Sequence, residues 1–188
     1  MTGGGEGDVR VWELRSRELV SHLKEHRAAV TGLAMYDDDV HAISCSRDRS
    51  FLCWELRSEK RVTSHTQRMG GINAVALSKD QTNIFTVGQE KRLTNWDLRE
   101  PNYVCAVELS SDGSDEAGCV AVSHSGAVVA TGGTNKELKL YEATGNHRLI
   151  AKMHGHSGTI TDLKFSPDDK QLTTVGDDGV IFVWNLYV

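Results

Sequence analysis

Two sets of histidine, hydroxyl and carboxylate residues are the features of this sequence that could carry chemistry. A hydroxyl activated by a histidine that an acid orients is the machinery of a hydrolase nucleophile. Each set here lies 28, 10 and 6 residues before a tryptophan. A nucleophile is needed once, beside an oxyanion hole, so a set that recurs at fixed spacing favours a structural role over a catalytic triad. The sets are His26, Ser44 and Asp48, and His156, Thr174 and Asp178.

Three other patterns in the sequence could carry chemistry, but the evidence for each of them is weaker. His154 and His156 could supply two metal ligands, but no third ligand follows at a matching spacing. The glycine-rich run 2–7 resembles a phosphate-binding loop, yet it lacks the Gly-Lys-Ser/Thr ending and a following helix. The four cysteines form no C-x-x-C pair and are expected to be small core residues. We therefore expect no metal and no cofactor.

Composition points to a soluble globular chain of about one domain. It has 188 residues, 39% of them hydrophobic, and a formal net charge of −5. Mild acidity disfavours non-specific binding to nucleic acid or anionic lipid, and no apolar run is long enough to span a membrane. Basic clusters at 47–49, 57–61 and 91–92 are either solvated turn charges or a contact patch for an acidic partner. The absence of a signal peptide favours a reducing, cytoplasmic location.

Aromatic residues divide the chain into repeats. Their spacings are 42, 42, 45 and 43 residues, and all four tryptophans fall on this series. A hydroxyl residue lies 10 residues before every one of these aromatics, and an acidic or amide residue lies 6 before. The aromatics are Trp12, Trp54, Trp96, Tyr141 and Trp184, and the hydroxyl residues are Thr2, Ser44, Thr86, Thr131 and Thr174.

Each repeat is predicted to contain four short strands. The residues one and three before each aromatic are apolar apart from Asn95, which is the alternation of a strand. In the last repeat we expect strands at 160–165, 171–175 and up to Trp184, and fourth strands between repeats as at 103–109 and 148–153. No segment shows a helical period with caps. The prediction is an all-β chain of about 17 strands.

The sequence resembles the WD40-repeat family. The resemblance rests on Gly155-His156 and Trp96-Asp97, and it covers essentially the whole chain. Variants of the two dipeptides occur in the other repeats, namely Glu25-His26, Trp12-Glu13, Trp54-Glu55, Tyr141-Glu142 and Trp184-Asn185. In this family the histidine, hydroxyl, acid and tryptophan form a buried hydrogen-bond relay. The resemblance thus implies two complete structural relays, His26–Ser44–Asp48–Trp54 and His156–Thr174–Asp178–Trp184.

The same resemblance implies a partial β-propeller of about four and a half four-stranded blades from a seven-bladed ring. We expect the blade of residues 110–153 to be degenerate, because it lacks the histidine and has Tyr141 and Asn135. The chain is expected to be the C-terminal part of a longer propeller, or to find its missing blades by self-association. The expected segments are 1–25, the end of a blade; 26–67 and 68–109, two blades; 110–153; and 154–188, a last blade without its fourth strand.

The leading functional hypothesis is a non-enzymatic scaffold that binds other proteins within a larger assembly. Residues just before the turn acids differ in charge and size, which favours them for partner recognition, with the acidic loop 112–116 nearby. The segment 68–78 with its flanks resembles WD-repeat proteins of cilia and flagella, which points to the axoneme and the cytoskeleton. The alternative is a ligand-binding or enzymatic propeller that uses its central channel. The candidate partner-binding residues are Arg47, Arg68, Gln89, Thr134 and Asp177.

Overall fold

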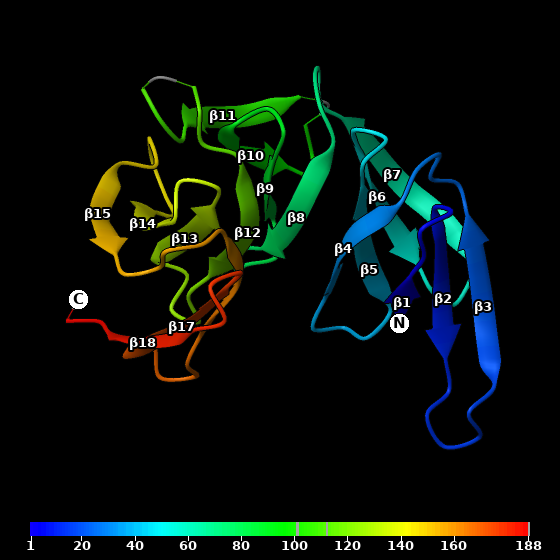
Figure 1. Cartoon of the computed structure of the whole chain (residues 1–188). Coiled ribbons are helices and arrows are strands. Elements are labelled where there is room, and N and C mark those ends of the chain that lie inside the picture. Colours follow the sequence, from blue (N-terminus) through cyan, green and yellow to red (C-terminus); the bar gives the residue numbers. More distant parts are fainter. Residues whose placement is uncertain (101, 112, 188) are drawn as a thin grey trace. The chain divides into compact units, whose positions relative to one another are not determined.

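The protein is built of antiparallel β-sheets (Figure 1). The computed structural model describes residues 1–100, 102–111 and 113–187. Within these ranges there are 18 strands and no helix, so the all-β prediction is confirmed with one strand more than expected. The total of seven blades and the residue limits assigned to each blade stay predictions.

The chain divides into two compact units, Met1–Val75 and Ala76–Val188, with the division inside strand β8. The first unit holds sheet A, which has three strands, and sheet B, which has four. Within each sheet, strands that follow one another in the sequence pair as antiparallel neighbours. Sheet A contains β1 (Thr2–Gly3), β2 (Asp8–Trp12) and β3 (Leu19–Lys24); sheet B contains β4 (Val30–Met35), β5 (His41–Ser46), β6 (Ser50–Glu55) and β7 (Lys60–Thr66).

Three further sheets follow in the sequence, and they are shown from green to red in Figure 1. Sheets C and D have four strands each, and sheet E has three. Sheet C contains β8 (Ile72–Leu77), β9 (Asn83–Gly88), β10 (Arg92–Asp97) and β11 (Tyr103–Glu108); sheet D contains β12 (Ala117–Val122), β13 (Val128–Gly133), β14 (Glu137–Glu142) and β15 (Leu149–His154); sheet E contains β16 (Ile160–Phe165), β17 (Gln171–Gly176) and β18 (Ile181–Asn185).

In each unit an apolar cluster lies between two sheets that follow one another in the sequence. In the first unit Val9 and Leu23 of sheet A cluster with Leu52 and Trp54 of sheet B. A fully buried side chain of this size contributes about 1.5–3 kcal/mol relative to an exposed one. In the second unit a larger cluster joins sheets D and E, with members Cys119, Val128, Ala130, Leu138, Leu140, Ile160, Leu163, Phe165 and Leu172.

Gly132 allows sheets D and E to approach closely. A Cβ atom at Gly132 would lie 2.6 Å from Cγ2 of Ile160, which no real side chain contact permits. The glycine in β13 therefore lets Ile160 of β16 pack directly on the strand backbone, and Ile160 is fully buried.

Candidate functional site

A hydrogen bond from the repeat aromatic to the hydroxyl residue occurs in all five sheets. The indole Nε1–H donates to the hydroxyl oxygen over 2.8–3.0 Å in four of them. In sheet D the phenol of Tyr141 shares a hydrogen bond with Thr131 instead. The two residues lie on paired strands two positions apart in register, where side chains on one face meet. The indole pairs are Trp12–Thr2, Trp54–Ser44, Trp96–Thr86 and Trp184–Thr174.

A register irregularity accompanies the aromatic in each sheet where its strand pairs with a following strand. The following strand carries one extra residue beside the aromatic, namely Val20, Val62, Val104 or Ile150. Such a bulge bends the strand that carries it and increases its local twist. The backbone irregularity therefore recurs together with the aromatic, at Val11/Trp12, Cys53/Trp54, Asn95/Trp96 and Leu140/Tyr141.

Sheet B extends this bond into a chain of four side chains. Ser44 accepts from Trp54 at 2.8 Å and lies 2.7 Å from Nε2 of His26. Nδ1 of His26 lies 3.0 Å from the Asp48 carboxylate. Because the Asp48 carboxylate only accepts, the neutral His26 ring carries its proton on Nδ1, and its Nε2 accepts from the Ser44 hydroxyl.

Sheet E repeats the arrangement. Thr174 accepts from Trp184 at 2.9 Å and lies 2.8 Å from Nε2 of His156. Nδ1 of His156 lies 3.0 Å from Oδ2 of Asp178. Both hydroxyl residues are fully buried and both histidines nearly so. The polar atoms of a would-be triad are thus bonded to one another inside a sheet.

The acidic ends of the two relays are strongly hydrogen-bonded. Desolvation alone would raise the pKa of Asp178, but N–H groups of Ser157 and Val180 and the His156 ring outweigh it and lower that pKa to about 2. For Asp48, desolvation is again outweighed, here by the Ser50 side chain and the Arg27 N–H, and the pKa is lowered. Both carboxylates are therefore charged acceptors at neutral pH.

Sheet D replaces the histidine–acid half of the relay with a buried ion pair. The Lys139 ammonium group is almost fully buried and donates to Asp115 and, at 2.7 Å, to the carbonyl oxygen of Leu109. Asp115 is buried as well and accepts from the Asn135 N–H at 3.2 Å. The carboxylate of Asp115, in the acidic loop 112–116, is therefore bonded inside the protein. Asp112 lies outside the described residues.

His147 and Asn95 link sheets C and D. Nδ2 of Asn95 on β10 donates to Nε2 of His147 over 3.1 Å, and Nδ1 of His147 lies 2.9 Å from the carbonyl oxygen of Glu142. Both side chains are buried. His147 lies at none of the relay positions, so the repeat spacing predicted no partner for it. In the other four repeats the residue before the aromatic is apolar, so the polar Asn95 at this position was the signal that its side chain has a buried hydrogen-bond partner.

The candidate partner-binding residues occupy connections at the strand ends. Four lie in the turn between the second and third strands of sheets B to E, and Arg68 follows β7. All five are exposed. Arg47 and Arg68 belong to the first unit and the others to the second. Thr134 already makes one hydrogen bond within the protein, because its hydroxyl accepts from the Glu116 N–H at 3.1 Å.

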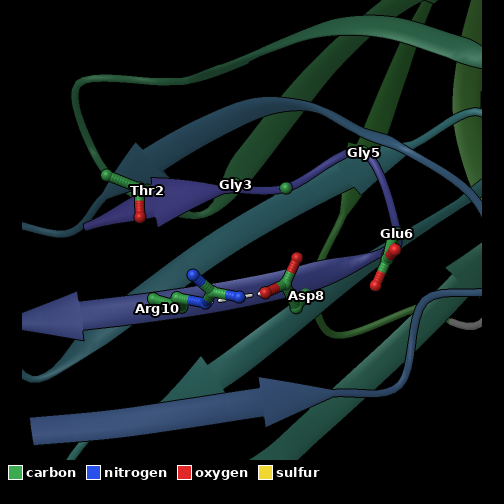
Figure 2. A pocket seen from close by; sticks show the side chains of 7 residues that line it. Thr2, Gly3, Gly5, Glu6, Asp8 and Arg10 are labelled. Atoms are coloured by element: carbon green, nitrogen blue, oxygen red, sulfur yellow. Dashed lines mark ion pairs between the residues drawn. The ribbon is translucent and has the colours of Figure 1, made fainter. Parts of the chain in front are cut away.

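The glycine-rich run leads from β1 into β2 and borders a hollow of about 380 Å³ (Figure 2). Asp8 in its wall is paired with Arg10 at 2.8 Å and with His22 at 3.1 Å. The Thr2 hydroxyl already accepts from Trp12. The wall therefore offers an ion-paired arginine rather than a free cation for a phosphate.

Three cysteines are buried and Cys105 is half-buried, and all four are free thiols. Burial raises the pKa of Cys45 to about 11 and that of Cys119 to about 12, which keeps both protonated and unreactive. Among the described residues, no group of three or more histidine, cysteine or acidic side chains could hold a metal ion. The same part of the chain has no helix that could cross a membrane.

Comparison with known proteins agrees with this geometry. The profile of the family described as "WD40: WD domain, G-beta repeat" matches residues 17–55 and 147–185. The chain carries WD40 repeats. The two matched segments are those that contain the complete relays, whereas the repeats with Trp96 and Tyr141 depart from the pattern. Each match begins near the last strand of one sheet and ends in the third strand of the next, so one WD40 repeat spans two sheets.

The chain is similar to several longer WD-repeat proteins. It is 47% identical over 58 residues to the nuclear distribution protein nudF of Emericella nidulans, a match covering 31% of this chain and 13% of that protein. It is 36% identical over 76 residues to the cilia- and flagella-associated protein 52 of Chlamydomonas reinhardtii, covering 39% and 12%. The macaque (Macaca fascicularis) protein of the same name is 25% identical over 186 residues, covering 98% of this chain and 32% of the relative. The chain thus spans at most a third of these relatives.

Proposed function

We propose that this chain belongs to a non-enzymatic scaffold that binds other proteins and forms a subunit of a larger cytoplasmic assembly. The observation that carries the proposal is the relay. The hydroxyl groups of Ser44 and Thr174, which a catalytic triad would use as nucleophiles, are fully buried and accept hydrogen bonds from the Trp54 and Trp184 indoles, so they are closed to a substrate. The side chains left on the surface at the strand ends differ between repeats, as a recognition surface requires.

We also propose a ciliary or axonemal setting for this assembly. The support is the similarity to cilia- and flagella-associated protein 52, which extends over nearly the whole chain in the macaque protein. Under this proposal the exposed turn residues Arg47, Gln89, Thr134 and Asp177, together with Arg68, contact neighbouring subunits.

Proximity labelling of the full-length protein in ciliated cells tests both proposals. The wild type is compared with a double variant, Arg47→Glu and Gln89→Ala, at turns that precede a third strand. The matched control is Arg57→Glu with Asn102→Ala, which places the same chemical changes in turns that follow a third strand. We expect axonemal proteins to be labelled by the wild type and the control, and lost by the test variant. Labelling unchanged in the test variant would contradict the assignment of these turns, and labelling confined to non-ciliary proteins would contradict the axonemal setting.

A further inference from the structure

Four arginines gather at one end of sheet B. Arg27 precedes β4, Arg47 and Arg49 lie in the turn between β5 and β6, and Arg68 follows β7. In an antiparallel sheet, the start of the first strand, the second turn and the end of the fourth strand are at the same end. We call Arg27, Arg47, Arg49 and Arg68 the arginine patch. All four side chains are exposed.

Hydrogen bonds hold the three segments of the patch together. The Arg27 N–H donates to Asp48 over 2.7 Å, and the Arg47 N–H donates to the carbonyl oxygen of Ala29 over 3.0 Å. The Gln67 N–H donates to the carbonyl oxygen of Arg49 over 2.9 Å. These bonds join the backbone segments that carry the arginines. The spacing between the four Cα positions is therefore set by the backbone of the sheet end.

Gly71 brings the β7–β8 connection against the same turn. A Cβ atom at Gly71 would lie 2.8 Å from the Arg47 Cα atom. A larger residue would push the connection, and Arg68 within it, away from the turn.

The patch is not neutralised within its own unit. Arg10 and Arg61 of the first unit form ion pairs with Asp8 and Glu25. By contrast, within the described residues 1–75 none of the four patch guanidinium groups pairs with a carboxylate. Asp48 beneath the patch is occupied by His26, Ser50 and a backbone N–H. Four like charges thus face solvent at one sheet end of a chain whose net charge is −5.

We propose that the arginine patch binds a carboxylate-rich segment of a partner protein, an inference that rests on the proposed scaffold function. Guanidinium groups match carboxylates through paired N–H donors, and arginine is favoured at interfaces. Met69, 71% exposed, lies next to Arg68 and adds the apolar contact that a protein segment can use. The patch has no aromatic residue on which a base of single-stranded nucleic acid would stack.

Fluorescence anisotropy with the 188-residue chain tests this inference. The probe is a labelled peptide of alternating glutamate and serine, and its uncharged counterpart has glutamine at every glutamate. Further arms use single-stranded RNA and vesicles rich in phosphatidylserine. We expect the glutamate peptide to bind, the glutamine peptide not to bind, and affinity to fall as salt rises.

The variants compare two exposed pairs on opposite ends of sheet B. Arg47→Ala with Arg68→Ala is expected to weaken binding about tenfold or more for each charge-assisted contact removed. Arg57→Ala with Lys60→Ala removes the same charge from the β6–β7 turn and the first residue of β7, and is expected to leave affinity unchanged. Circular dichroism establishes that both variants fold.

Three results would overturn the inference: no binding of the glutamate peptide, equal loss of affinity in both variants, or tighter binding of RNA or vesicles than of the peptide. None of these three results contradicts the scaffold proposal, because that proposal is tested separately by proximity labelling of the full-length protein. If proximity labelling finds no protein partners while the peptide binds as expected, the scaffold proposal is wrong. The arginine patch then binds carboxylates but does not serve a scaffold.

Discussion

Sheets B and D have the same topology but contain different buried polar groups. Both have four strands in sequence order and an aromatic residue bonded to a hydroxyl residue on the neighbouring strand. In sheet B the bond continues through His26 to Asp48. In sheet D the series of hydrogen bonds does not continue to a histidine. Lys139 instead donates both to Asp115 and to the carbonyl oxygen of Leu109. The aromatic–hydroxyl pair is therefore the constant part of the repeat, and the rest is replaceable.

The replacement changes the energetics of the sheet. A relay of largely neutral hydrogen bonds contributes about 0.5–1.5 kcal/mol per bond. A buried ion pair gains little net stability, but losing one partner leaves an uncompensated charge. We expect sheet D to be the more sensitive of the two to the loss of a single side chain.

The largest effect is predicted for Lys139→Met. It leaves the buried Asp115 without its cation and should lower the free energy of unfolding by about 3–5 kcal/mol, measured by urea denaturation. Adding Asp115→Leu should restore most of that loss, because both charges are then gone. Lys152→Met, at an exposed lysine on β15, is the control and should have little effect. A small loss with Lys139→Met would contradict the role of the pair.

A smaller effect is predicted for Ser44→Ala. It removes a partner from both Trp54 and His26, and each orphaned buried group costs about 1–3 kcal/mol. Thr86→Ala in sheet C removes the hydroxyl partner of Trp96 at a site without the relay histidine and should cost less. The measurement is again the free energy of unfolding. Equal losses in the two variants would show that the relay adds nothing beyond the indole bond.

Acid should weaken the relay sheets. The pKa of Asp178 is depressed to about 2, below the value near 3.9 of an unfolded aspartate. Its contribution to stability is therefore complete above about pH 4 and is lost as the pH falls toward 2. Hydrogen exchange of sheet E between pH 5 and pH 2 measures the effect, and Asp178→Asn should remove this part of the pH dependence. An unchanged acid response in that variant would mean that other groups cause it.

The smallest effect is predicted for Tyr141→Phe. It removes the bond with Thr131 and should cost about 0.5–1.5 kcal/mol, measured by urea denaturation. Tyr141→Trp offers an indole donor for the same hydroxyl and should retain more stability than the phenylalanine variant. The reverse order would show that packing of the ring outweighs the hydrogen bond.

Sequence periodicity predicted the strands and the positions of the relay residues, because a fixed spacing in a repeat maps to a fixed place in each sheet. The predicted strand at 160–165 coincides with β16. Periodicity did not predict the Lys139–Asp115 pair, since it exists only in the repeat that departs from the pattern. A lysine between Leu138 and Leu140, in the repeat that lacks a histidine, was the available signal.

Contacts between sheets were also beyond the repeat pattern. His147 reaches Asn95 from the connection between β14 and β15, at none of the relay positions, so the repeat register could not pair them. The exposure of Arg47 was predictable, because the residue lies in the turn between two strands. Its proximity to Arg49 was evident from the basic cluster 47–49, but its grouping with Arg27 and Arg68 required the hydrogen bonds at the sheet end.

The protonation of His26 and His156 tests the relay most directly. Long-range proton–nitrogen NMR of the folded chain at neutral pH distinguishes the two ring nitrogens. The relay requires both rings to carry the proton on Nδ1, toward Asp48 and Asp178, with Nε2 as an acceptor from Ser44 and Thr174. Rings protonated on Nε2, or exchanging freely between the two forms, would contradict it.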